Sequence, residues 1–212
     1  IEKNIAFQDD LLRKLAGKTL VQRSIDKARE LGIEDSSICV YTGSELVALS
    51  ADRAGVRTYL NPNLMTGVVT PVEAFLSFLQ EWSCGFEWII HLSPYAPLLG
   101  VEALLDAQKR IQTEGSDVVN SARLVTDYKT STDVQDLTAQ FFQRPEKKIF
   151  HYSDAFTIIR SSALRVAVPE HLRVITVLLG EDEFEVKSHR DWWVCEKLLA
   201  RKRIVFRVIG TN

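Results

Sequence analysis

Three charged side chains near the carboxyl-terminal end of the chain alternate in a way that could support metal or phosphate chemistry. Glu183, Glu185 and Lys187 alternate with apolar residues, and this spacing predicts a short strand over 184–186 with the three charges on one face. Carboxylate oxygens suit a hard cation such as Mg²⁺, and a lysine ammonium binds phosphate as a point charge. A solvated strand face is the alternative interpretation of the same pattern.

A proline-rich segment is the second candidate for chemistry. Ser93–Pro97 directly follows the apolar run 87–92, which predicts a buried strand. Two prolines fix the backbone angle φ twice and remove two N–H donors, so the loop is expected to be rigid. Such a loop could present backbone groups to a flat base or a sugar. A plain rigid turn is the alternative.

Helical and strand patterns alternate along the chain. Helices are expected over 20–31, 44–55, 70–79, 101–114 and 188–199, and strands over 37–42, 56–59, 87–92, 117–122, 155–159, 173–179, 184–186 and 204–209. The last of these helices is expected to begin with a capping box formed by Ser188 and Asp191. Strands separated by helices predict right-handed βαβ units and a mostly parallel sheet.

Ligands of such sheets bind beyond the carboxyl ends of the strands. The candidate positions are therefore the loops after Thr42, Tyr59, Leu92, Ala122 and Val186. The stretch 124–148 is different, because it is polar and weakly periodic. It is expected to form a small inserted arm that contacts a partner subunit.

Composition excludes several classes of protein. Among 212 residues, 46% are hydrophobic, which is too many for a disordered chain. The 26 Lys and Arg against 28 Asp and Glu give a net charge of −2, so no nucleic-acid partner is expected. No apolar run suits a membrane span, and the spacing of Cys39, Cys84 and Cys195 predicts reduced thiols in a cytoplasmic protein. Motifs of serine hydrolases, zinc enzymes and P-loop ATPases are absent.

Seven segments, spread along nearly the whole chain, occur in the same order as the sequence patterns of a known family. They are Lys3-Asn4-Ile5, Leu15–Leu20, Val40–Ser44, Asn61–Leu64, Leu92–Leu98, Ser116–Ser121 and Glu185–Trp192. They resemble, in this order, the patterns K-N-I, L-x-G-K-P-L, V-S-T-D-S, R-P-x-x-L, L-x-P-T-S-P-L, D-S-V-V-S-V and D-I-D-x-x-x-D-W of the acylneuraminate cytidylyltransferases, or CMP-sialic acid synthetases. The chain resembles a variant branch in which this domain precedes a nucleotide-sugar hydrolase-like domain.

The resemblance implies a Rossmann-like three-layer α/β sandwich with a mostly parallel mixed sheet, of the nucleotide-diphospho-sugar transferase type. It implies transfer of CMP from CTP to a sialic-acid-like nonulosonic acid, with Mg²⁺ and release of pyrophosphate, for surface-glycan precursors. It also implies a single domain over 1–212, a homodimer and the start of a fused domain at 203–212. The candidate residues are Lys3 and Lys187 as catalytic cations, Glu185 as the metal ligand, and Asn4, Thr42, Asn61, Ser93, Pro94, Tyr95, Ala96 and Asp154 as nucleotide- or substrate-binding residues.

Several positions depart from the family pattern. Asn61 and Leu99 stand where the family has arginines, and Lys187 replaces the second aspartate of the carboxylate pair. The family's glycine-rich nucleotide loop would precede Lys3, and the chain either starts at its tail or never had it. Lys187 could replace the charge of a metal, or it could mark a site that has lost metal binding. These departures leave an alternative function: a non-catalytic cytidylyltransferase-like module that binds a nucleotide-sugar or docks a partner enzyme.

Overall fold

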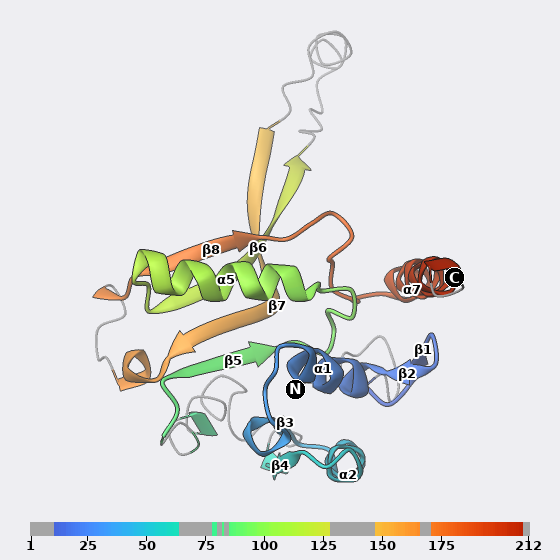
Figure 1. The fold of residues 1–212 in the computed structure, drawn as a ribbon, viewed down its shortest axis with the longest axis horizontal. Coiled ribbons are helices and arrows are strands. Elements are labelled where there is room, and N and C mark those ends of the chain that lie inside the picture. Colours follow the sequence, from blue (N-terminus) through green and yellow to red (C-terminus); the bar gives the residue numbers. More distant parts are fainter. Residues whose placement is uncertain are drawn as a thin grey trace, which may run out of the picture.

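A four-stranded mixed sheet forms the centre of the molecule in the computed structural model (Figure 1). The structure describes residues 11–63, 78–79, 82, 85–127, 147–165 and 171–209. The strand order is β5 (Trp88–Leu92), β7 (Lys147–Arg160), β6 (Val118–Asp127) and β8 (Val174–Leu178). β7 runs antiparallel to both of its neighbours, whereas β6 and β8 are parallel, so β5, β6 and β8 share one direction.

A second, parallel pair of strands comes from the amino-terminal part of the chain. β3 (Cys39–Thr42) and β4 (Arg57–Leu60) pair in parallel and are connected by α2 (Glu45–Arg53). This is the βαβ arrangement that the alternating pattern predicts. The short hairpin of β1 (Lys14–Leu15) and β2 (Lys18–Thr19) leads into α1 (Leu20–Glu30).

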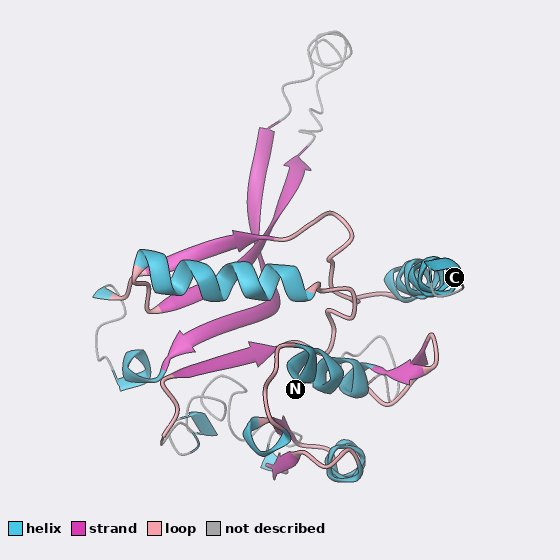
Figure 2. Cartoon of the chain, in the orientation of Figure 1, coloured by secondary structure: helices cyan, strands magenta, loops and turns pink. Residues whose placement is uncertain are grey.

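Figure 2 shows the helices beside the strands of the sheet. α5 (Val101–Glu114) covers the central sheet and begins and ends where the sequence predicts. Its buried residues Leu104, Ala107 and Ile111 share one core with Val119, Ile158 and Val177 of the strands. Gly115 ends the helix in the left-handed region (φ +63°), where a side chain would be strained. The α/β fold class with a mixed sheet is confirmed.

β7 contains a bulge at the centre of the sheet. Asn120 of β6 pairs with Thr157, but the next residue, Ser121, pairs with Ser153, so residues 154–156 have no partner on β6. The fully buried Ser121 hydroxyl lies 2.7 Å and 3.0 Å from the carbonyl oxygens of Ser153 and Phe156, and it accepts the Phe156 N–H at 3.2 Å. Ser121 thereby provides partners for backbone groups that the bulge removes from the ladder.

Beyond the bulge, β6 and β7 continue as a two-stranded ribbon that projects from the sheet (Figure 1). The ribbon pairs Leu124 with Phe150 and Asp127 with Lys147. The predicted arm, 124–148, therefore begins and ends in paired strands, and residues 128–146 lie outside the described part of the chain. Contact of the arm with a partner subunit stays a prediction.

Two predicted strands are wrong. Residues 204–209 belong to α7 (His189–Ile209), because a short apolar run fits a helix as well as a strand and here continues an established helix. Residues 184–186 form no strand. The side chains of Glu183 and Glu185 instead accept hydrogen bonds from the backbone of Gly100 and Asp154. The Asp191 N–H donates to Ser188 Oγ at 3.2 Å, which is one of the two hydrogen bonds of the predicted capping box, whereas Asp191 Oδ2 accepts the Ser188 hydroxyl at 2.8 Å and the Lys187 N–H at 3.0 Å.

The helix predicted from Thr70 lies outside the described residues except at Phe78 and Leu79, which are helical. Within the described residues, no helix is both long enough and apolar enough to cross a bilayer.

Candidate functional site

Three segments meet at the carboxyl ends of β5 and β8. The arrowheads of both strands point toward the side on which α7 lies (Figure 1). The Ser93 N–H donates to the Ala155 carbonyl oxygen at 3.0 Å, and the Val186 N–H donates to the Tyr95 carbonyl oxygen at 2.7 Å. We call residues 93–96, 153–155 and 183–187 the loop cluster. It joins the proline loop, the β7 bulge and the charged loop after β8.

The proline loop is a largely buried segment of this cluster, and its two prolines make it rigid. Pro94 and Ala96 are buried, so their side chains pack inside the protein. The side chain of Lys27 on α1 is itself buried, and its Nζ donates to the Ala96 carbonyl oxygen at 3.4 Å. Tyr95 is half-buried and packs against two apolar cores, so the loop can contribute shape and backbone groups to a ligand.

Glu183 ties the charged loop to the start of α5. Its Oε1 accepts the Gly100 N–H at 2.5 Å, and its Oε2 accepts the Gly180 N–H at 2.8 Å. Gly100 is the N-cap residue of α5, where a negative charge is favourable because of the helix dipole. A Cβ at Gly100 would lie 2.9 Å from Glu183 Oε1, so a larger residue there would shift this carboxylate. Both oxygens of Glu183 therefore have a structural role.

Glu185 lies at the centre of the cluster. Its Oε1 accepts the Ser153 hydroxyl at 2.7 Å and the Asp154 N–H at 2.5 Å, and its Oε2 lies 2.5 Å from Lys187 Nζ. The side chain of Glu185 is 8% exposed, whereas that of Lys187 is 69% exposed. Burial raises the pKa of Glu185, but the hydrogen bonds from Lys187, Ser153 and the Asp154 backbone outweigh it and leave the pKa below its ordinary value. Glu185 is therefore ionised at neutral pH.

The donor set at Glu185 differs from the one that a bound Mg²⁺ requires. Mg²⁺ needs carboxylate oxygens that are open to the ion, and each Glu185 oxygen already has a hydrogen-bond or ion-pair partner. Where the sequence pattern placed a metal, the structure places the ammonium of Lys187. The described residues also contain no group of three or more His, Cys, Asp or Glu side chains that could hold a metal ion. As arranged, Glu185 does not fit a metal site.

Asp154 is exposed at the bulge and is the carboxylate of the cluster that faces solvent. Its charge acts on His91 of β5: burial lowers the pKa of His91, and the Asp154 carboxylate opposes that shift without reversing it. His91 is therefore neutral at physiological pH.

Thr42 and Asn61 lie at the carboxyl ends of β3 and β4, in the parallel pair. The Asn61 N–H donates to the Thr42 carbonyl oxygen at 2.8 Å, and the Thr42 hydroxyl, which is 1% exposed, accepts the Ser44 N–H at 3.1 Å. The Asn61 amide donates to the Tyr41 hydroxyl at 3.3 Å and accepts the Asn63 N–H at 3.1 Å. Both residues thus shape the ends of their strands.

The structure brings together most of the predicted site residues. Those in the loop cluster are Ser93, Pro94, Tyr95, Ala96, Asp154, Glu185 and Lys187. Thr42 and Asn61 lie at the end of the other strand pair, and Lys3 and Asn4 lie outside the described residues. Sequence reasoning missed Ser153, Ser121 and Lys27. A bulge gives no periodic signal, so no pattern could have singled out the two serines.

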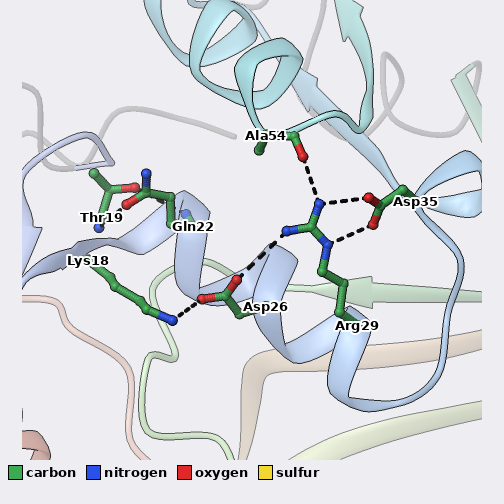
Figure 3. Close-up of polar contacts among 7 residues, drawn as sticks. All are labelled: Lys18, Thr19, Gln22, Asp26, Arg29, Asp35 and Ala54. Atoms are coloured by element: carbon green, nitrogen blue, oxygen red, sulfur yellow. Dashed lines mark hydrogen bonds and ion pairs between the residues drawn. The ribbon is translucent and has the colours of Figure 1, made fainter.

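Two cations, Lys18 on β2 and Arg29 on α1, have carboxylate partners of their own (Figure 3). Lys18 Nζ lies 2.5 Å from Asp26 Oδ2, and Arg29 donates to both carboxylate oxygens of Asp35 and to the Ala54 carbonyl oxygen. These contacts connect α1 to the loop before β3 and to the end of α2. Lys18 on β2 is therefore an exposed residue paired with α1 through Asp26.

The two described cysteines are unsuited to nucleophilic chemistry. Burial raises the pKa of Cys39 to about 11 and that of Cys195 to about 12. Since the thiolate is the reactive form, both thiols stay protonated and unreactive at neutral pH.

These features define a class: a Rossmann-like α/β fold of the nucleotide-diphospho-sugar transferase type, whose loops converge at the carboxyl edge of a mixed sheet. No protein-family model and no curated protein matches the sequence.

Solved structures do match. The chain is similar to CMP:2-keto-3-deoxy-manno-octonic acid synthetase complexed with CTP, with a TM-score of 0.65, 10% identity, and coverage of 94% of this chain and 95% of that one. It is equally similar to 4-diphosphocytidyl-2C-methyl-D-erythritol synthase from Anaerococcus prevotii DSM 20548 (TM-score 0.65, 10% identity, 92% and 95% coverage). A further structure of that synthase gives a TM-score of 0.61 at 13% identity, with 90% and 95% coverage. At such identities the likeness establishes the fold.

Proposed function

We propose that this protein is a nucleotidyltransferase that joins CMP from CTP to a sialic-acid-like nonulosonic acid and releases pyrophosphate. The supporting observation is the match over almost the full length of both chains to a synthetase complexed with CTP, together with synthases whose names also contain a cytidyl product. The sugar acid is proposed from the seven sequence segments that resemble acylneuraminate cytidylyltransferases.

In the proposed reaction, the anomeric hydroxyl oxygen forms a bond to the α-phosphorus of CTP. The bond from that phosphorus to the bridging oxygen breaks, pyrophosphate leaves with the bonding electrons, and the hydroxyl proton passes to water. Negative charge grows on the leaving oxygens, so fixed cations lower the barrier. In this proposal the exposed ammonium of Lys187 supplies such a charge, and Lys3 is proposed to supply another.

The other cluster residues are proposed to position the substrates. The buried proline loop offers a rigid backbone edge from Ser93 to Ala96 for the base or sugar, and Asn4 is proposed to contact the nucleotide. Mg²⁺ stays a prediction for the triphosphate itself, whose charge it would neutralise when bound. No step is assigned to a metal on Glu185, because the oxygens of that carboxylate already have partners.

Pyrophosphate release tests this proposal directly. The protein is incubated with CTP, UTP or ATP and a panel of nonulosonic acids, with Mg²⁺ present, and pyrophosphate is measured by a coupled assay. We expect release with CTP and at least one nonulosonic acid, and less with the other nucleotides. Absence of turnover with every combination would exclude the transferase.

The internal contacts of Glu183 and Glu185 favour a second candidate, a non-catalytic module that binds a nucleotide-sugar or docks a partner enzyme. In that case both carboxylates only stabilise loops. Calorimetry separates the two functions: the module predicts CMP-sugar or CTP binding without turnover, or no binding. Binding of CTP accompanied by turnover would exclude it.

We also propose that the arm over 124–148 contacts a second copy of the chain. Phe150 and Tyr152 on the projecting part of β7 are 64% and 78% exposed, which is unusual for large side chains on paired strands. Light scattering on the wild type and on Phe150→Ser/Tyr152→Ser is expected to give a dimer and a monomer, respectively. A wild-type monomer at assay concentration would contradict the proposal.

A further inference from the structure

We propose that Lys187 is a built-in cation that takes the place of a divalent metal at Glu185, so that this part of the nucleotide site works without a metal on the carboxylate. The inference rests on the proposed function and deepens it. It starts from the disagreement between the metal that the sequence pattern predicts at Glu185 and the ion pair that the structure contains.

Glu185 and Lys187 differ in how far their side chains are exposed to solvent. The carboxylate of Glu185 is inside, 8% exposed, and the ammonium of Lys187 lies outside it, on a side chain that is 69% exposed. An ammonium has three N–H donors, and Glu185 Oε2 accepts one of them. Lys187 follows β8 at the carboxyl edge of the sheet, where ligands of this kind of fold bind, and its side chain is exposed enough for the other two donors to meet a ligand. A metal ion bound to the Glu185 carboxylate would place its positive charge where the Lys187 ammonium now lies.

The backbone around Lys187 is fixed on both sides. The Val186 N–H donates to the Tyr95 carbonyl oxygen at 2.7 Å, and the Lys187 N–H donates to Asp191 Oδ2 at 3.0 Å. Glu185 is itself fixed by Ser153 and by the bulge at Asp154. The backbone of Lys187 is therefore fixed before a ligand arrives, and the ion pair with Glu185 favours one direction of its exposed side chain.

Charge balance agrees with this role. Two carboxylates at these positions would carry a charge of about −2 and would need a divalent cation before they could face a triphosphate. Glu185 together with Lys187 is neutral, and the difference between the two arrangements equals the charge of one divalent ion. The start of α7 at His189 adds the positive end of a helix dipole close by.

The first test uses Mn²⁺ alone, followed by electron paramagnetic resonance, on the full chain. We expect no site of sub-millimolar affinity that depends on Glu185 in the wild type. Lys187→Asp is expected to create such a site, and Lys187→Asp/Glu185→Gln to lose it. Lys109→Asp, on the exposed face of α5, makes the same change of charge elsewhere and is expected to bind no Mn²⁺. A wild-type Mn²⁺ site that disappears in Glu185→Gln would overturn the inference.

The second test measures CTP binding by calorimetry in EDTA and in Mn²⁺. In EDTA, Lys187→Asp is expected to bind CTP about tenfold or more weakly than the wild type, and to recover affinity when Mn²⁺ is added. Equal CTP affinity in Lys187→Asp and wild type in EDTA would overturn the inference. Failure of the wild type to bind CTP at all would instead count against the proposed function, and the Mn²⁺ experiment would still decide the role of Lys187. Circular dichroism verifies that each variant is folded.

Discussion

The proline loop after β5 and the charged loop after β8 lie at the same edge of the sheet, yet they are held by different forces. In the proline loop Pro94 is buried and Ala96 belongs to an apolar core, as does Leu98 directly after the loop. The charged loop is held by the carboxylates of Glu183 and Glu185, which accept hydrogen bonds from distant segments. Apolar packing fixes one wall of the proposed site, and long-range polar contacts fix the other.

This difference should appear first as a difference in stability. Leu98 is 4% exposed in a core with Trp192 and Cys195, so Leu98→Ala removes buried apolar contacts and leaves a cavity. We expect the free energy of unfolding to fall by about 3 kcal/mol. Urea denaturation measures it, and Leu105→Ala, at a position that is 50% exposed, is the control with a change below about 1 kcal/mol. Equal losses in the two variants would show that the loop is not packed as described.

The charged loop should lose less when its central carboxylate is neutralised. Glu185→Gln keeps the shape but weakens the acceptors for Ser153 and Asp154 and removes the partner of Lys187. The expected loss is about 2 kcal/mol in the free energy of unfolding, measured in urea at pH 7. Glu181→Gln, an exposed residue of the same loop, is the matched control and should be near neutral. A loss no greater than that of the control would place Glu185 outside the network.

Acid should remove the contribution of Glu185 to the free energy of unfolding and leave the contribution of the apolar packing around the proline loop unchanged. The pKa of Glu185 is below its ordinary value of 4.5 in the folded protein, so its stabilising effect is fully present above that value. The effect is lost as the pH falls through the lower folded pKa. The stability difference between wild type and Glu185→Gln should therefore shrink below about pH 4.5, whereas that between wild type and Leu98→Ala should stay constant. A constant Glu185 difference down to pH 3 would contradict this.

The smallest effect is expected at Glu183, the second carboxylate of the loop. Glu183→Gln retains an acceptor for the Gly100 or the Gly180 N–H but loses the charge at the start of α5. We expect a loss of about 1 kcal/mol in unfolding free energy, smaller in high salt. Glu196→Gln on the exposed side of α7 is the control. A greater loss than for Glu185→Gln would reverse the order of the two carboxylates.

The comparison also explains what the sequence could predict. The helices at 20–31 and 101–114 have apolar stripes and end at glycine, and these local signals suffice for α1 and α5. The proline loop was identifiable because prolines act on their own neighbourhood.

The charged loop was predicted wrongly as a strand, because its conformation depends on partners far along the chain. Glu183 binds Gly100, and Glu185 binds the bulge at Asp154. The bulge in turn depends on Ser121, on another strand. Spacing along one segment contains no information on such contacts. The alternation of Glu183, Glu185 and Lys187 predicted one strand face, whereas in the structure Glu183 and Glu185 accept hydrogen bonds from two different segments.

The central claim, that the loop cluster holds a cytidine triphosphate, is tested most directly by a crystal structure of the protein grown with saturating CTP. We expect the phosphates within hydrogen-bonding distance of Lys187 Nζ and the cytidine against the backbone of residues 93–96. An unoccupied cluster at saturating CTP, or a nucleotide bound elsewhere on the protein, would contradict it.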